Sequence, residues 1–268
     1  MSLSTPRLIV APTLEEMARI YTLSREGGPA SERFAAYRAI VGERWGLSAF
    51  NPMAGPHAAE AVAALLAIDA ERLAEESGAE AMRLCEHDAD VTLAVVLAAP
   101  GLWTDRLATE VEYRTTAPRR AGCGLVYQWT RETVDPAAIK REAAADAVRV
   151  MWTSHHAPKG HALSVREVLR REGLAYAIGE NAFGDLQPDE TRAIAEAVDV
   201  LGDSTTAGDL GSVLYGDPAA VAHGWTPLGI SEHGGFRWAV RTAEDLIRRL
   251  GAPAAMRDPV FRFKDPKM

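Results

Sequence analysis

Three of the seven histidines in the chain lie close together, at positions 155, 156 and 161. Histidine is the commonest metal ligand among side chains, and its charge changes near neutral pH, so it often serves as a catalytic acid or base. The segment 153–163 separates two stretches with helical spacing and is expected to be a loop. His155, His156 and His161 are therefore the candidate catalytic residues. The competing interpretation is that these side chains only cap helix ends and bond to the backbone of a polar loop.

The same segment has the features of an anion site. Ser164 and Glu167 have the spacing of a capping box, which predicts that a helix begins there. Free amides and the dipole at a helix N-terminus attract anions, and Lys159 adds a positive charge. Trp152 precedes the histidines and is a candidate pocket wall; the alternative is that it is a core or rim residue. We expect Lys159 and Trp152 to contact a small molecule that carries a carboxylate or phosphate group.

A divalent metal ion is an alternative ligand for the histidines. Two or three imidazoles with a carboxylate and one open position would bind zinc or iron and activate water. Adjacent histidines in an extended loop point in opposite directions, so this loop cannot supply the whole site. The candidate ligands are His161, His223, His233 and Asp209. No HExxH pattern accompanies them, and any cofactor other than a metal stays unknown.

Two further segments contain residue types suited to ligand binding. In the segment 202–212, the hydroxyls and free amides of Ser204, Thr205 and Thr206 suit an oxyanion. We expect this loop to close over a bound anion, unless it is only a surface loop of turn-forming residues. Asn51 lies in a loop that enters a helix, the position where ligands gather in open α/β sheets. The structural alternative is that the neighbouring prolines only fix the turn.

Glu110, Glu112 and Arg114 alternate with apolar residues, a pattern that predicts one face of a strand. A second strand is expected at 124–130, and the basic segment between the two predicts a long hairpin loop. Neighbouring carboxylates can act as acid and base when burial separates their pKa values. Because Arg114 stands beside them, we interpret the three residues as a solvated or cross-strand ion-pair face.

The overall composition limits the class of protein. The chain has a formal net charge of −8 and a sequence pI of about 5.4. Phosphate backbones bind to basic surfaces, so this charge disfavours nucleic acid as a partner. Cys85 and Cys123 lack the spacing of a redox or zinc motif and fit a reducing compartment. The sequence indicates no signal peptide and no apolar stretch of membrane-spanning length. We expect a soluble cytoplasmic protein without membrane association. The sequence does not predict which oligomeric state the protein has.

The order of the expected elements predicts an α/β fold, with a mixed, partly parallel sheet and helices on its faces. The expected strands are 8–11, 91–98, 110–114, 124–130, 174–178 and 236–240. One helix is expected from 57 to 76, and the helix that begins at Ser164 is expected to end at Gly173. We predict a single domain over 1–268; the alternative is an α+β fold of two lobes that divides near 131–135.

Together, these features predict an enzyme that acts on a small anionic molecule. Histidine acid-base chemistry or metal-assisted chemistry would carry the reaction, and the expected class is a hydrolase or a lyase. The alternative is a non-catalytic protein that binds a small molecule or serves as an assembly subunit. An enzyme is expected to bring the 155–161 and 203–233 segments together in one concave pocket.

Overall fold

The computed structural model describes residues 6–45, 54, 56–98, 105–115, 123–130, 132–157, 161–181, 183–186 and 188–258. Three strands in these residues form one sheet in the order β1-β2-β3, and both strand pairs are parallel. The strands are β1 Leu8–Ala11, β2 Val91–Ala98 and β3 Cys123–Trp129. Val10 pairs with Leu93 in the first strand pair, and Ala94 pairs with Leu125 in the second.

Helices make up most of the described chain. They are α1 Leu14–Arg25, α2 Ala30–Trp45, α3 Pro56–Ala67, α4 Ala70–Leu84, α5 Arg106–Thr115, α6 Pro136–His156, α7 Val165–Ile178, α8 Pro188–Leu201, α9 Ala207–Tyr215, α10 Asp217–His223, α11 Gly234–Leu250 and α12 Ala252–Arg257. The predicted α/β class is confirmed in this coarse form, as a helix-rich fold around a small parallel sheet.

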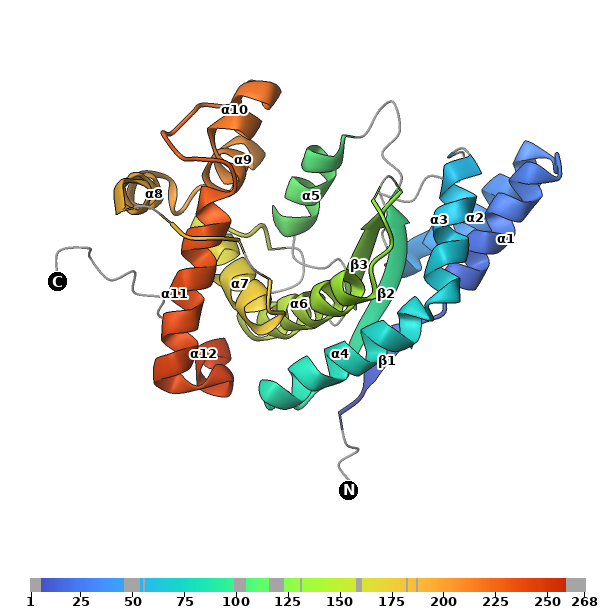
Figure 1. Ribbon diagram of the computed structural model, residues 1–268, viewed down its shortest axis with the longest axis horizontal. Helices are drawn as coiled ribbons and strands as arrows, with labels where there is room; N and C mark the ends of the chain where they lie inside the picture. The colour runs from blue at the N-terminus through green and yellow to red at the C-terminus, as the bar shows by residue number, and fades with distance from the viewer. Residues whose placement is uncertain are drawn as a thin grey trace.

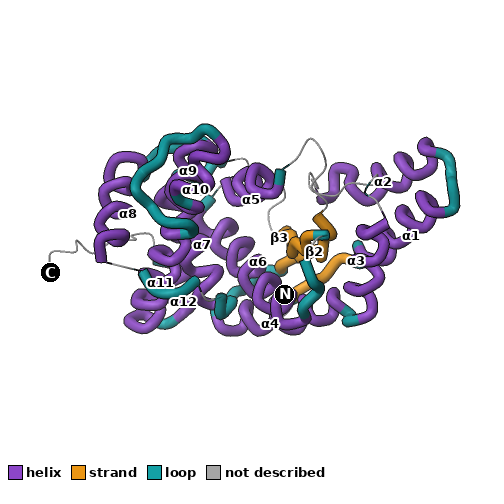
Figure 2. The backbone as a smooth tube through the Cα atoms, turned by 45° about the horizontal axis from the view of Figure 1, so that its top comes forward, coloured by secondary structure: helices purple, strands orange, loops and turns teal. Residues whose placement is uncertain are grey.

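The helices pack in layers that begin at the sheet. α4 and α6 lie side by side against it, α4 on β1 and β2 and α6 on β2 and β3 (Figure 1). α1 and α3 pack on each other and also contact β2. Figure 2 shows the strands enclosed by helices. Every residue of β2 except Thr92 is buried, as expected for a parallel strand covered by helices. α7 packs on α6 and α11 packs on α7, which extends the molecule away from the sheet.

α6 lies very close to β3 because β3 contains a glycine. A Cβ atom at Gly124 would lie 2.9 Å from Cδ2 of Leu93 and 3.0 Å from Cγ2 of Val150 on α6. A larger residue at this position would push the helix away from the strand. The glycine thus fixes how near the charged residues of α6 come to the end of the sheet.

Three segments predicted as strands are helical. Residues 110–114 belong to α5, which connects β2 to β3, so the predicted hairpin is wrong. Parallel strands cannot be joined by a hairpin and need a crossover such as this helix. Residues 174–178 continue α7, and residues 236–240 lie in α11. Short apolar runs do not distinguish a buried strand from a buried helix. Among the described residues the sheet is wholly parallel rather than mixed.

The helix predicted from 57 to 76 is instead two helices, α3 and α4. Asp69 separates them with a left-handed backbone, φ 54° and ψ 52°. Its carboxylate accepts a hydrogen bond from Nε of Arg72 at 2.8 Å. Aspartate tolerates this conformation better than most residues because its short side chain can bond locally.

The predicted loop 153–163 is partly helical, since α6 continues to His156. The capping box at the start of α7 is confirmed. The hydroxyl of Ser164 accepts from the backbone N–H of Glu167, and the Glu167 carboxylate accepts from the backbone N–H of Ser164 at 2.8 Å.

α7 does not end at Gly173, as predicted, but continues to Ile178. A Cβ atom at Gly173 would lie 2.4 Å from the carbonyl oxygen of Ala239 on α11. This glycine therefore serves the close packing of two helices rather than a helix end.

No helix in the described part of the chain has both the length and the apolar character needed to cross a membrane. The single domain, the boundary near 131–135 and the cytoplasmic location stay predictions.

Candidate functional site

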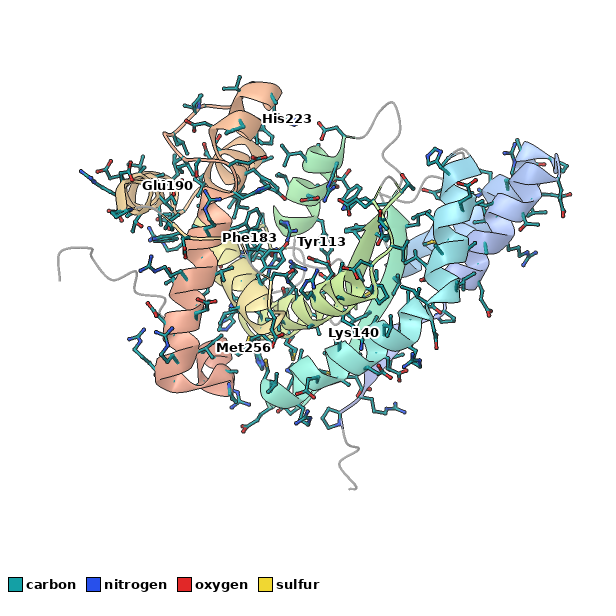
Figure 3. The ribbon with its side chains drawn as sticks, viewed as in Figure 1. Tyr113, Lys140, Phe183, Glu190, His223 and Met256 are labelled. Atoms are coloured by element: carbon teal, nitrogen blue, oxygen red, sulfur yellow. The ribbon has the colours of Figure 1, made fainter. Side chains whose placement is uncertain are left out.

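A pocket lies at the carboxyl end of β3, with a cavity volume of about 370 Å³. Tyr127, Gln128 and Trp129, the last three residues of the strand, line it. In sheets of parallel strands, ligands bind beyond the carboxyl ends. The other walls come from α5, α6 and α7 and from residues at the end of α9 and the start of α11. Figure 3 labels Tyr113 and Phe183, two of the wall residues, in the space between α5 and α7.

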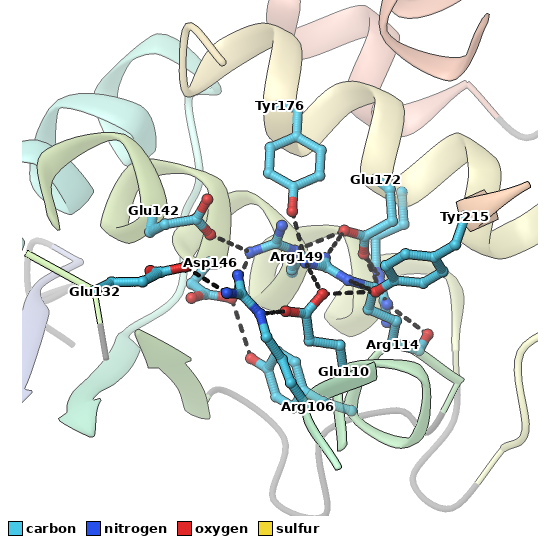
Figure 4. Close-up of polar contacts among 12 residues, drawn as sticks. Arg106, Glu110, Arg114, Glu132, Glu142, Asp146, Arg149, Glu172, Tyr176 and Tyr215 are labelled. Carbon is cyan, nitrogen blue, oxygen red and sulfur yellow. Dashed lines mark hydrogen bonds and ion pairs between the residues drawn. The ribbon is translucent and has the colours of Figure 1, made fainter. Parts of the chain in front are cut away.

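α6 supplies the charged floor of the pocket. The helix begins where the side chain of Asp135 accepts a hydrogen bond from the backbone N–H of Ala137 at 2.9 Å. Glu142, Asp146 and Arg149 follow at helical spacing, so the three side chains share one face. All three line the pocket (Figure 4).

Glu172 on α7 is fully buried behind this floor and pairs with three guanidinium groups. Nε of Arg149 donates to it at 3.0 Å, Nε of Arg171 donates at 3.0 Å, and Arg114 also donates. Burial alone raises the pKa of Glu172, but the three arginines outweigh burial and lower the pKa to about 2. Glu172 therefore carries a negative charge that neutralises part of the buried arginine cluster.

Asp146 behaves differently, because burial dominates. Burial raises the pKa of Asp146 to about 6, although Arg149 opposes the shift and donates to the carboxylate from Nη1 at 2.8 Å. The hydroxyl of Tyr113 also donates to Asp146, at 3.1 Å, and accepts from the backbone N–H of Leu125 at 3.0 Å. A buried carboxyl group with a pKa near neutrality can exchange a proton at physiological pH.

Arg149 has an unused hydrogen-bond donor. Its side chain is only 4% exposed, and its Nε and Nη1 are bonded as described above. Nη2 is buried and has no hydrogen-bond partner among the described residues. The guanidinium carbon lies 4.8 Å from the centre of the Tyr176 ring. A buried donor that belongs to a charged group and has no partner is uncommon in folded proteins and calls for an explanation.

α5 places a second set of charged groups at the pocket. The hydroxyl of Tyr215 donates to Glu110 at 2.8 Å and accepts from Nε of Arg114 at 3.2 Å. Arg106 donates to Glu110 at 2.7 Å, and its guanidinium lies 4.9 Å from the ring centre of Trp129. Burial opposes ionisation of Glu110, but Arg114 and Arg106 outweigh it and keep its pKa below the ordinary value. Glu110 and Arg114 form an ion pair, with 4.0 Å between Oε2 and Nη2, but both are largely buried and lie on a helix. The predicted solvated or cross-strand face of a strand is therefore wrong.

Aromatic rings form another side of the pocket, and several of them come from residues that follow α6 in the chain. Phe183 and Phe236 stack with ring centres 5.5 Å apart, and Tyr215 meets Phe236 edge-on at 5.0 Å. Tyr127 and Trp129 add two further rings at the end of β3. The pocket therefore combines charged groups with apolar ring surface, as small-molecule sites commonly do.

His155 and His156 lie at the other end of α6 and do not line this pocket. The ring of His155 contacts that of His87 at 5.3 Å, and the ring of His156 packs on Trp152 at 4.8 Å. Nε2 of His156 lies 2.7 Å from the carbonyl oxygen of Met256. Burial lowers the pKa of both His87 and His156. Trp152 itself is buried and does not form a wall of this pocket.

His161 and His223 each face one carboxylate. Nε2 of His161 lies 3.4 Å from Glu167, and Nε2 of His223 lies 3.4 Å from Asp105. In Figure 3, His223 lies well away from Met256, the residue bonded to His156. His223 is thus far from the His156 end of the 155–161 segment, whereas Ser204 lies beside the start of α7, where its carbonyl oxygen accepts from the backbone N–H of Val165 at 2.9 Å. That the two segments share one concave pocket stays a prediction.

The segment that holds Ser204, Thr205 and Thr206 is shorter than predicted, because α9 begins at Ala207. The hydroxyls of Ser204 and Thr206 donate to Asp209 at 2.5 Å and 2.8 Å. These hydroxyls and Asp209 thus bond to one another at the start of a helix. Asn51 and Lys159, the two remaining predicted binding residues, lie outside the described residues.

Among the residues that the structure describes, no three His, Cys, Asp or Glu side chains are close enough to hold a metal ion. The four candidate ligands His161, His223, His233 and Asp209 are therefore not gathered at one place. His233 is the member of this set that lines the pocket. It precedes α11 with a left-handed backbone, φ 58°, and its ring lies 5.8 Å from that of Tyr215.

Glu142, Asp146, Arg149 and Glu172 were not among the predicted site residues. One signal for them is present in the sequence. Asp146 and Arg149 interrupt an otherwise apolar helical stretch, and a charged residue on a buried helix face requires a partner. That signal indicates a buried ion pair but does not identify the partner, which here is Glu172 on the next helix.

Comparisons of the chain with models of protein families, with curated proteins and with solved structures find no match.

Proposed function

We propose that this protein binds a small molecule that carries a carboxylate or phosphate group in the pocket at the end of β3. The observation that carries the proposal is the buried Nη2 of Arg149, which has no partner among the described residues. An unsatisfied buried donor costs about 1–3 kcal/mol, and more on a charged group. An oxygen of an anionic ligand would supply the missing acceptor, with the strength of a charge-assisted hydrogen bond.

The surroundings of Arg149 hold its guanidinium in one orientation. Its other nitrogens donate to Glu172 and Asp146, so the group cannot rotate without breaking those bonds. A cavity of about 370 Å³ also matches the size of ordinary small-molecule sites. Because Nη2 is closed to solvent, binding would require its neighbours to shift enough to admit an oxygen of the ligand.

The test is calorimetric titration of the purified protein with inorganic phosphate, acetate and benzoate at neutral pH. Arg149→Lys keeps a positive charge beside Glu172 but removes Nη2. We expect this variant to bind the best of the three anions about tenfold more weakly, the loss of one charge-assisted hydrogen bond. Arg83→Lys is the matched control, because Arg83 is exposed on α4, and it should bind as the unaltered protein does. The proposal fails if no small carboxylate or phosphate binds, amino acids included, or if Arg149→Lys binds every such ligand with unchanged affinity.

A second candidate function is catalysis of proton transfer on such a molecule. The observation that favours it is Asp146, a buried carboxyl group with a pKa of about 6 that is bonded to Tyr113 in the same pocket. Asp146 would accept a proton from a carbon next to the carboxylate of the ligand, and solvent would return one. Acid-base catalysis by a histidine also stays a proposal. The histidine that lines the pocket is His233.

This candidate is tested by incubating the protein with a panel of small carboxylates in deuterated water and following loss of the adjacent C–H signal by NMR. Exchange by the unaltered protein and none by Asp146→Asn would support it. Equal exchange by both proteins would assign the chemistry to another group.

A further inference from the structure

The charges in the pocket wall balance. Four arginines and four carboxylates line it, so their formal sum is zero. They are Arg106, Arg114, Arg141, Arg149, Glu110, Glu132, Glu142 and Asp146. A ligand with a single charge would leave that charge unbalanced in a partly buried site, where opposite charges attract and like charges repel more strongly than in water. A zwitterion would not, because it brings one charge of each sign.

One donor and one acceptor on α6 have hydrogen-bonding capacity that no described residue uses, and they belong to groups of opposite charge. One is Nη2 of Arg149, the unused donor. The other is the carboxylate of Glu142, which makes no hydrogen bond to a described residue and lies 3.6 Å from Nη1 of Arg149. The two residues are seven positions apart on α6, so their side chains extend from one face of the helix. The Arg149 guanidinium and the Glu142 carboxylate are therefore neighbours, which suits a ligand whose anionic and cationic groups are close together.

Asp146 adds to the negative side of this pair. Glu142 and Asp146 are one helical turn apart, and like charges at that spacing repel each other. After burial, which is the larger cause, Glu142 contributes to the raised pKa of Asp146. A cationic group placed against Glu142 would offset this repulsion. Arg149 would repel that cationic group, and an anionic group on the same ligand would compensate for the repulsion.

The aromatic side of the pocket indicates the rest of the ligand. Phe236 contacts Phe183 and Tyr215, with ring centres 5.5 Å and 5.0 Å apart, and all three residues line the same cavity. Aromatic surface of this kind packs a further ring edge-on or offset.

Resting on the proposed function, we infer that the ligand is an α-amino acid with an aromatic side chain. Its carboxylate accepts from Nη2 of Arg149, its ammonium group donates to Glu142, and its ring packs among the aromatic residues of the wall. Neither a simple anion nor a simple amine satisfies both unused groups.

The experiment compares three probes that share one ring: phenylalanine, 3-phenylpropionate, which lacks the ammonium group, and 2-phenylethylamine, which lacks the carboxylate. Calorimetric titration at neutral pH is expected to show phenylalanine binding about tenfold more tightly than either analogue. If 3-phenylpropionate binds as tightly as phenylalanine, the zwitterion is wrong and the anion pocket stands. If no acid of any kind binds, the proposed function itself is wrong.

A variant tests the assigned role of Glu142. Glu142→Gln should weaken phenylalanine about tenfold and leave 3-phenylpropionate unchanged or tighter, because a repelling carboxylate is removed. Glu75→Gln, an exposed carboxylate on α4, is the matched control and should change neither affinity. A Glu142→Gln protein that keeps the full preference for phenylalanine over 3-phenylpropionate would overturn the inference.

Discussion

Glu172 is a carboxylate buried among positively charged side chains. It is completely buried, yet it stays ionised because Arg114, Arg149 and Arg171 surround it (Figure 4). A buried ion pair adds little stability relative to apolar packing, but removal of one partner leaves the others unpaired. The network therefore fixes the position of Arg149, and thereby of its unused donor, more than it stabilises the fold.

Glu172→Gln is expected to destabilise the protein by about 3–5 kcal/mol, because three buried guanidiniums lose their common counter-charge. Urea unfolding monitored by circular dichroism measures the change. Glu75→Gln, which is exposed, should differ from the unaltered protein by less than about 0.5 kcal/mol. A loss below about 1 kcal/mol in Glu172→Gln would mean that the arginines find other partners or water.

The raised pKa of Asp146 predicts a contribution to folding stability that decreases as pH rises. Its pKa is raised from 3.8 to about 6 in the folded protein, so the folded state holds a proton that the unfolded state has already released. The contribution of Asp146 to stability is therefore greatest in acid and falls as pH rises from about 4 to about 7. Asp146→Asn does not titrate, so it should gain stability relative to the unaltered protein over this interval. The expected gain is on the order of 2 kcal/mol, measured as the difference in unfolding free energy at the two ends. A difference that does not change with pH would show that the group is not protonated near neutrality.

At the scale of the helices and strands, the sequence predicted β1, β2 and β3 because each is an apolar run with few charges. It failed where a similar run is helical. Residues 174–178 and 236–240 are mostly buried segments of α7 and α11, and nothing in their composition distinguishes them from strands. The helical course of 110–114 follows from the parallel order of β2 and β3, which is a long-range property. The role of a glycine is equally hard to predict from its neighbours in the sequence. Gly173 has the local pattern of a helix end, but it allows a close contact with a helix that is distant in the sequence.

Gly173→Ala is expected to destabilise the protein by about 1–3 kcal/mol, although alanine favours helices. The new Cβ atom would lie 2.4 Å from the carbonyl oxygen of Ala239, a backbone atom that can move only if α7 and α11 separate. Gly208→Ala is the matched control, since its nearest neighbour is the Trp225 side chain at 3.3 Å. Thermal unfolding compares the two variants. Equal stability of Gly173→Ala and the unaltered protein would mean that the helix contact is looser than described.

At the scale of the whole molecule, the pocket is built from residues more than a hundred positions apart, such as Glu110 and Phe236. The sequence analysis gave weight to residues that are neighbours along the chain, and so favoured His155, His156 and His161. The fold places His156 against α12 and His155 against His87, both at the end of α6 away from the pocket, and His161 beside Glu167. Of the predicted site residues that the structure describes, His233 is the one that lines the pocket, and its distance in sequence from α6 gave no reason to group it with Arg149.

Hydrogen exchange distinguishes a ligand bound in the pocket at the end of β3 from a ligand bound near His155 and His156. A ligand in the pocket would join α5, α6 and α11 and should slow amide exchange in α5 and in the first half of α6, because binding stabilises the folded state over locally open ones. Phenylalanine at about 100 times its dissociation constant corresponds to about 2.7 kcal/mol of stabilisation, enough to slow exchange roughly 100-fold where opening abolishes binding. In Glu142→Gln the same concentration should protect these segments far less. Protection confined to α12 and to the end of α6 at His155 and His156 would contradict the proposed pocket and return the site to the histidines.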